Sequence, residues 1–357
     1  MMRHVLFPRR LVPAALSLGA MVFSSSAWAD GFHTRGRTLL DGNGEPFIMR
    51  GINHAHAWQR ERTETVLPQI ADTGANIVRI ALSHGHPWGP TPKSEVRRLL
   101  RQAKAEGMIL MLEIHNTTGY GENEWGVAIP EVMPYWLSLA PLLKGQEDFV
   151  LINIGNEPVG NGVSPAVYEE MHAEAIRDLR RAGLTHTIVV DGSGWGQDHD
   201  RTMVDAAPRL AAADPLNNVV FSVHMYQVYG DADAVRSYFE DFAALDLPLI
   251  VGEFGADHQG EPVDEEAIFR LSNQMDVGYI GWSWSGNGKG VEDLDIVLDF
   301  DPDRLSPWGQ RLINGPGGIA ETARPATVFP VPTDKRVQRG ALRVKGSPSI
   351  RARFPRH

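Results

Sequence analysis

The sequence predicts one (β/α)8 barrel, a TIM barrel, and three observations favour this fold. Eight short apolar runs rich in Val and Ile recur along the 357 residues, and several lack polar alternation, as strands covered on both faces do. Helix-like stretches with apolar spacing near 3.6 separate the runs. No Gly-x-Gly-x-x-Gly or Walker A pattern accompanies a strand, which weighs against a nucleotide-binding doubly wound sheet.

The predicted elements alternate strictly, with one strand followed by one connection. Segment 31–43 precedes the first strand and predicts a short hairpin that caps the bottom of the barrel. No linker interrupts residues 30–330, so we expect one catalytic domain. The predicted strands are 47–54, 76–83, 108–115, 149–157, 187–191, 218–226, 249–254 and 278–285, and the predicted helices are 62–71, 94–106, 165–182, 234–245 and 264–275.

Residues 1–29 predict a secretory signal peptide. Three arginines precede an apolar stretch, and Ala27-Trp28-Ala29 offers a small-residue cleavage site. The apolar stretch is too short to span a bilayer, and no later segment is apolar enough to do so. We therefore expect a secreted protein, extracellular or periplasmic, without a transmembrane segment.

The charge is unevenly distributed. The net charge of −10 combines +3 in residues 1–29, +7 in residues 331–357 and −20 in the body between them. Such an acidic body argues against nucleic-acid binding and suits a neutral polysaccharide. The basic segment 331–357 lacks apolar periodicity and predicts a disordered tail. The absence of cysteine excludes disulfides and thiolate metal sites. We also expect the protein to be a monomer.

Polar and aromatic residues gather at the ends of the predicted strands. In a barrel of this class the active site is built at the C-terminal ends of the strands. Buried polar groups there cost stability unless they are paired, so their concentration indicates a function. The strand ends carry Asn53, His54 and His56; Arg79 and His84; Glu113 and His115; Asn156 and Glu157; His224 and Tyr226; Glu253; and Trp282 and Trp284.

Glu157 and Glu253 are the predicted catalytic pair. They end hydrophobic runs three strands apart in a barrel of eight, so we expect them to face each other across its mouth. Glycosidic cleavage needs two such carboxyl groups, and a separation of about 5–5.5 Å gives retention of anomeric configuration. The alternative is that both are structural carboxylates, paired with Arg79 and neighbouring backbone.

Asn156-Glu157-Pro158 and Gly252-Glu253-Phe254-Gly255 surround this pair. These motifs resemble the signatures of glycoside hydrolase family 5, and the resemblance extends over residues 31–329. Segments 49–58, 191–197 and 282–287 are most similar to those of bacterial endo-β-1,4-mannanases of that family. Supporting matches are Arg50-Gly51-Ile52-Asn53, Asn76-Ile77-Val78-Arg79, Leu112-Glu113-Ile114-His115, His224-Met225-Tyr226 and Trp282-Ser283-Trp284.

The resemblance implies a role for each matching position. Glu253 would attack the anomeric carbon, with Arg79 and Tyr226 keeping it ionised. Glu157 would act first as acid and then as base. Asn156 would bind the sugar 2-hydroxyl.

The same resemblance implies the surroundings of the −1 sugar, the unit whose glycosidic bond is cleaved. His115 and His224 would hold it and would position Glu157. Trp282 would form its stacking floor, with Trp284 as a second candidate. The predicted substrate-binding set is completed by His56, at the end of the first strand, and Trp195, in a loop.

The expected activity is endo-acting, retaining hydrolysis of β-1,4-mannan or a related polysaccharide, with no cofactor and no metal. An endo-β-1,4-glucanase of the same family is the alternative, because mannose and glucose differ in one hydroxyl orientation at C2. Asn116 follows His115 where close relatives are expected to carry Asp.

A metal-dependent barrel hydrolase of the amidohydrolase type is an alternative from another class. His54 and His56 alternate at the end of the first strand and suit Zn²⁺, with His115 and His224 available to complete the site. The fourth strand ends in Asn-Glu instead of Lys, and the fifth lacks His. The pattern therefore supplies a zinc site only in part.

Overall fold

The computed structural model describes Met1 and residues 31–330. The predicted signal peptide and the predicted basic tail lie outside the described residues. Eight parallel strands close into a barrel in chain order, which confirms the predicted fold class. The barrel strands are β3 (Arg50–His54), β4 (Ile77–Leu82), β5 (Ile109–Ile114), β6 (Val150–Asn153), β7 (Ile188–Asp191), β8 (Val219–Met225), β9 (Leu249–Phe254) and β12 (Gly278–Gly281).

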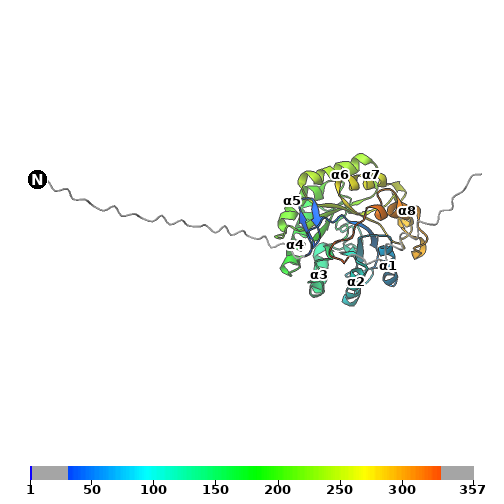
Figure 1. Cartoon of the computed structure of the whole chain (residues 1–357), viewed down its shortest axis with the longest axis horizontal. Helices are drawn as coiled ribbons and strands as arrows, with labels where there is room; N and C mark the ends of the chain where they lie inside the picture. Colours follow the sequence, from blue (N-terminus) through cyan, green and yellow to red (C-terminus); the bar gives the residue numbers. More distant parts are fainter. Residues whose placement is uncertain (2–30, 331–357) are drawn as a thin grey trace, which may run out of the picture.

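Helices surround the strands on the outside (Figure 1). Every residue of the eight barrel strands is buried, because side chains pointing inward fill the barrel and those pointing outward pack against helices. Within residues 31–330, no helix has the length and apolar character needed to cross a bilayer. The helices are α1 (Thr63–Asp72), α2 (Lys93–Glu106), α3 (Ile129–Leu143), α4 (Pro165–Arg181), α5 (Thr202–Ala213), α6 (Ala232–Leu245), α7 (Glu265–Met275), α8 (Pro307–Asn314) and α9 (Ile319–Thr322).

Within the described part of the chain, all five predicted helices form, and four more were not predicted. Two of these, α3 and α5, contain proline in their interior, at Pro134, Pro141 and Pro208. Proline removes a backbone donor and usually ends a helix. Burial of one face compensates here: α3 packs Trp136 and other apolar side chains fully into the core.

The predicted hairpin caps the bottom of the barrel. Its strands are β1 (His33–Arg35) and β2 (Thr38–Leu40), paired antiparallel. The carbonyl oxygen of Phe32 accepts hydrogen bonds from Thr187 Oγ1 (3.0 Å) and Asn218 Nδ2 (2.8 Å). These two residues directly precede β7 and β8, so the hairpin is fixed at the end opposite the predicted site.

The loops contain short strands and single helical turns. A two-stranded hairpin of β10 (Asp257–His258) and β11 (Glu261–Pro262) follows β9. Single-turn 3-10 segments follow several strands, where the chain leaves the barrel. They are η1 (His115–Thr117), η2 (Gln227–Tyr229), η3 (Glu292–Leu294) and η4 (Leu298–Phe300).

Candidate active site

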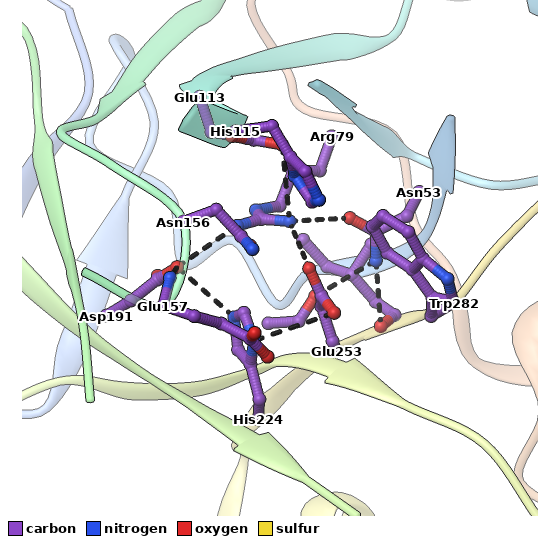
Figure 2. Close-up of polar contacts among 12 residues, drawn as sticks. Asn53, Arg79, Glu113, His115, Asn156, Glu157, Asp191, His224, Glu253 and Trp282 are labelled. Atoms are coloured by element: carbon purple, nitrogen blue, oxygen red, sulfur yellow. Dashed lines mark hydrogen bonds and ion pairs between the residues drawn. The ribbon is translucent and has the colours of Figure 1, made fainter. Parts of the chain in front are cut away.

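Two carboxylates face each other at the C-terminal mouth of the barrel (Figure 2). Glu253 lies within β9, and Glu157 lies four residues beyond the end of β6. An oxygen of Glu157 and an oxygen of Glu253 are within 4.8 Å of each other. Retaining glycosidases place these groups about 5–5.5 Å apart and inverting ones about 6.5–9.5 Å. The spacing therefore fits the retaining arrangement.

Glu157 has an unusual backbone conformation. Its φ is 41°, in the left-handed region that non-glycine residues rarely adopt. Its carbonyl oxygen accepts from Gly119 N (2.8 Å), and its own N–H donates to Asp191 Oδ2 (3.3 Å). The prediction that the fourth strand extends through Glu157 is wrong, since the strand ends at Asn153 and this turn re-aims the side chain.

Glu253 is held by two donors that the sequence predicted. Arg79 Nη1 donates to Oε1 over 2.7 Å, and the Tyr226 hydroxyl donates to Oε2 over 2.9 Å. Burial, reinforced by the charge of Glu253, raises the pKa of Tyr226 well above its usual value, so the phenol keeps its proton. Both donors stabilise Glu253 as a carboxylate, which is the form a nucleophile requires.

Arg79 uses all five of its N–H donors within the barrel mouth. The side chain is 1% exposed, and guanidinium groups have five donors in a fixed plane. Burial alone would lower its pKa, but Glu113, Asp191 and Glu253 raise it above the usual value. Its acceptors are Asn153 Oδ1 (2.9 Å), Asn53 Oδ1 (3.1 Å), Glu253 Oε1 (2.7 Å), Asn156 Oδ1 (2.7 Å) and Asp191 Oδ2 (3.1 Å).

His224 lies between carboxylates. Its Nδ1 is 2.9 Å from Glu157 Oε1 and 3.6 Å from Glu253 Oε2, and its Nε2 is 3.2 Å from Asp191 Oδ2. The β8–β9 register shifts between Val223 and His224, and such an irregularity re-aims a side chain. Gly196 (φ 72°) lets a loop pass over the ring, because a Cβ there would be 2.8 Å from His224.

The charges around Glu157 favour holding a proton at this position. Burial raises the pKa of Glu157, and Glu253 adds to the increase, while His224 opposes it. Burial would lower the pKa of His224, but Glu253 and Asp191 outweigh it and raise that pKa to about 10. A group with a raised pKa next to an ionised carboxylate is the arrangement expected of a general acid beside a nucleophile.

Asn156 and His115 lie beside the pair, as predicted. Asn156 accepts from Arg79, and its Nδ2 donates to Thr118 Oγ1 over 2.9 Å. His115 Nδ1 is 2.9 Å from Glu113 Oε1. These contacts fix the orientation of both side chains at the mouth.

An aromatic wall extends from the pair across the loops that follow β3, β4 and β5. The Trp282 ring is nearly parallel to His115, at 18° with centroids 5.6 Å apart. Trp58 packs between Trp88 (4.9 Å) and Trp282 (6.3 Å), and Trp125 lies 5.0 Å from Trp88. Trp58, Trp88 and Trp125 are partly exposed. Aromatic faces of this kind stack on the apolar faces of sugar rings.

Two residues of the predicted substrate-binding set do not reach the mouth. His56 is 3% exposed and contacts Thr63 Oγ1 (2.7 Å) and Glu95 Oε2 (3.2 Å), beside a groove of about 600 Å³ between α1 and α2. The reason is that β3 ends at His54 and the chain turns outward. Trp284 is 1% exposed and belongs to the hydrophobic core, because β12 ends at Gly281 and strand alternation no longer applies beyond it.

Trp195 lies on the acid side of the mouth. It is half-buried, and its Nε1 donates to Glu122 Oε2 over 2.7 Å. Its ring covers Gly119, where a Cβ would come within 2.3 Å of it. Since Gly119 donates to the Glu157 carbonyl, Trp195 packs over the loop that adjoins the acid.

Several site residues were missing from the predicted set. Three of them, Asp191, Asn53 and Asn153, accept hydrogen bonds from Arg79. The fourth, Glu113, orients His115. Their positions could have indicated a role in the site, because each is the last or near-last residue of a barrel strand. What the sequence does not give is which of these side chains share one guanidinium.

The four histidines of the metal-hydrolase alternative do not converge on one point. His54 Nε2 (2.8 Å) and His56 Nδ1 (2.7 Å) both contact Thr63 Oγ1, while His115 contacts Glu113 and His224 contacts Glu157. Both ring nitrogens of His224 already face carboxylates, Nδ1 at 2.9 Å from Glu157 and Nε2 at 3.2 Å from Asp191. The donor set therefore fits proton transfer between carboxyl and imidazole groups better than metal ligation.

Comparison with known proteins gives a consistent result. The family model for cellulase (glycosyl hydrolase family 5) matches residues 40–288. A mannan endo-1,4-β-mannosidase of Cellvibrio japonicus is 47% identical over 321 residues, covering 90% of this chain and 74% of the relative. That of Streptomyces lividans is 45% identical over 306 residues, covering 85% and 79%.

A solved structure is similarly close. The mannotriose complex of a Thermomonospora fusca β-mannanase superposes with a TM-score of 0.82 at 46% identity. The match covers 85% of this chain and all of that one.

Proposed function

The chain belongs to glycosyl hydrolase family 5, and from that premise we propose that it is an endo-acting, retaining β-1,4-mannan hydrolase. The observation that carries the mechanism is the separation of at most 4.8 Å between oxygens of Glu157 and Glu253. That distance lets Glu253 reach the anomeric carbon directly and leaves no room for a water between carboxylate and sugar.

In the first step, a Glu253 oxygen forms a bond to the anomeric carbon. The glycosidic C–O bond breaks, and Glu157 gives its proton to the departing oxygen. Arg79 and Tyr226 hold the attacking carboxylate in place, so little reorientation is needed. The product of this step is a glycosyl ester of Glu253.

In the second step, water attacks the anomeric carbon. Glu157, now ionised, takes the proton from that water, and the ester bond to Glu253 breaks. Esterification of Glu253 removes a negative charge near Glu157, and this charge raises its pKa in the free enzyme. The same group can therefore be an acid in the first step and a base in the second.

The −1 sugar would lie between the aromatic floor of Trp282 and the polar groups of Asn156, His115 and His224. Arg79 fixes Asn156, and Glu113 fixes His115, so both meet the sugar with set orientations. The tryptophans beyond Trp282 would support further sugar units along the chain. This extended wall suits an enzyme that cleaves within a polymer.

The identity of the polymer rests on the relatives. The two reported relatives are named mannan endo-1,4-β-mannosidases, and the reported structure holds mannotriose. These likenesses favour mannan over cellulose for this chain.

We further propose that the protein is exported through the sequence at 1–29 and acts as a monomer outside the cytoplasm.

Reducing-sugar release by the purified protein from β-mannan, glucomannan and carboxymethylcellulose tests the function. We expect release from the two mannans and a rapid fall in viscosity, as endo-cleavage produces. Release from carboxymethylcellulose alone would replace the mannanase assignment with a glucanase.

Two variants control that measurement. Glu157→Ala and Glu253→Ala should each abolish release while keeping the far-ultraviolet circular dichroism of the wild type. An active Glu253→Ala protein would overturn the double displacement. Activity lost on treatment with a chelator would favour the metal-dependent alternative instead.

A further inference from the structure

Asp191 is a fully buried carboxylate at the end of β7 for which the proposed chemistry has no direct use. Both of its oxygens are enclosed by donors. Oδ1 accepts from Asn153 Nδ2 (2.9 Å), and Oδ2 accepts from Arg79 Nη2 (3.1 Å). With donors on every side it has no need of its own proton, so Asp191 carries a negative charge below the catalytic pair.

Asp191 contacts the acid through its backbone. The N–H of Glu157 donates to Asp191 Oδ2 over 3.3 Å. Glu157 has a left-handed φ of 41°, a strained conformation that persists only when the surroundings hold it. The buried carboxylate therefore helps to keep the turn that aims the acid at the mouth.

The second contact runs through His224. Asp191 Oδ2 lies 3.2 Å from Nε2, and Glu157 Oε1 lies 2.9 Å from Nδ1, on the opposite side of the ring. Nδ1 makes a hydrogen bond with Glu157, whereas Nε2 lies at ion-pair distance from Asp191 without hydrogen-bond geometry. Glu157 and His224 therefore form a hydrogen-bonded pair, with Asp191 as the fixed charge behind them (Figure 2).

We propose that Asp191 is a positioning residue which orients Glu157 and, through the imidazole of His224, sets the pH at which the acid loses its proton. The proposal rests on the proposed role of Glu157 as the acid. Oδ2 of Asp191 makes contacts of 3.1–3.3 Å with three neighbours, namely Arg79, the Glu157 backbone and His224.

The charged groups that face His224 determine the sign of the effect. Glu157 comes from the loop after β6, Glu253 from β9 and Asp191 from β7, and Arg79 on β4 is paired with the last two. Removing the negative charge of Asp191 weakens proton binding by His224. The last proton of the Glu157–His224 pair is then lost at a lower pH.

The test is the pH profile of kcat/KM for Asp191→Asn, which keeps the side-chain shape and removes the charge. We expect its alkaline limb to move to lower pH by about 1–3 units, the usual effect of an opposite charge at this distance. A purely structural role would lower activity or stability without moving that limb. An alkaline limb at the wild-type position overturns the proposal.

Tyr168→Phe is the matched control. Its hydroxyl donates to the backbone carbonyl oxygen of Asp191 over 2.7 Å, so the variant disturbs the same residue without removing a charge. Its alkaline limb should stay in place. In a His224→Gln background, Asp191→Asn should move the limb no further, because the route through the imidazole is already broken.

A second measurement decides the question if Asp191→Asn does not fold. The ring ¹⁵N shifts of His224 in the wild-type protein should show both nitrogens protonated, or one proton shared with Glu157, through neutral pH. A free neutral imidazole at pH 7 overturns the proposal. A wild-type protein inactive on every glycan would instead refute the proposed function, whatever these shifts are.

Discussion

Arg79 Nη1 and Glu253 Oε1 lie 2.7 Å apart, and the two side chains are 1% and 5% exposed. The cation is enclosed on all sides by acceptors, and the carboxylate is open only toward the mouth. This one ion pair joins the interior network of the barrel to the group that would attack the substrate.

Replacing Arg79 with Met should destabilise the protein as well as inactivate it. Asp191 and Glu253 would remain as buried charges without their cation, which costs about 3–5 kcal/mol. Urea denaturation measures the loss. Arg98→Met is the control, because Arg98 is 60% exposed and lies 3.8 Å from Glu95, so its removal should change stability by about 0.5 kcal/mol or less.

Hydrolysis should retain the anomeric configuration. Carboxylate oxygens within 4.8 Å allow a covalent intermediate and exclude a water held between carboxylate and sugar. Proton NMR of freshly cleaved mannohexaose should show the β-anomer first, followed by slow mutarotation. An initial α-anomer would refute the double displacement and would require a wider active mouth.

Glu253→Gln should bind mannooligosaccharides without cleaving them. The amide keeps the size of the side chain and still accepts from Arg79 or Tyr226, but it cannot form a stable glycosyl ester. Calorimetry should give a dissociation constant close to the wild-type KM for a slow substrate. Unfolding of this variant would instead indicate that Glu253 is chiefly structural.

Trp88→Ala should weaken binding of long oligosaccharides more than it slows cleavage. Trp88 contacts Trp58 and Trp125 and is far enough along the wall to meet a sugar beyond the −1 position. Loss of one stacking face, worth about 0.5–1.5 kcal/mol, corresponds to a rise in KM of roughly 2- to 12-fold. Trp284→Phe, in the core, should lower stability and leave KM unchanged.

Stability should fall as the pH is lowered from about 6.5 toward 4. Burial lowers the pKa of His172 and three other histidines, so in this range the unfolded chain binds protons that the folded chain does not, and folding is disfavoured. Each contributes at most about 1.4 kcal/mol per pH unit. The lowered pKa values are about 3 for His54 and about 4 for His56, His172 and His186.

Urea denaturation at pH 7 and pH 5.5 measures this dependence. His172→Phe should keep the ring contact with Tyr168. It should reduce the difference in the free energy of unfolding between pH 7 and pH 5.5 by the contribution of one histidine. An unchanged difference would mean that His172 is protonated in the folded state.

The sequence was sufficient for the barrel and for the two carboxylates, and the reasons are local. Strands such as 109–114 are buried on both faces and therefore appear as continuous apolar runs. Glu157 and Glu253 interrupt or end two of these runs with a charge. Helix α3 was missed because interior proline is a strong local stop signal, and only packing in the folded protein overrides it.

The errors in the site have a different origin. The alternation of strand residues was extended through His56 and Trp284, although β3 and β12 have already ended at His54 and Gly281. Beyond a strand end, side-chain direction depends on the turn, which residue spacing does not encode. Asp191 was missed because its role comes from contacts with residues far away in the chain.

The saturation of Arg79 has a consequence for how this scaffold can change. Its five partners come from different strands and loops, and exchanging any one of them leaves a buried donor or acceptor empty. We therefore expect substitutions among these residues to be tolerated only in combination. Trp58, Trp88 and Trp125 of the aromatic wall have no such shared cation, so each can be replaced without the others. The preference for a glycan can therefore change at this wall while the catalytic residues stay the same.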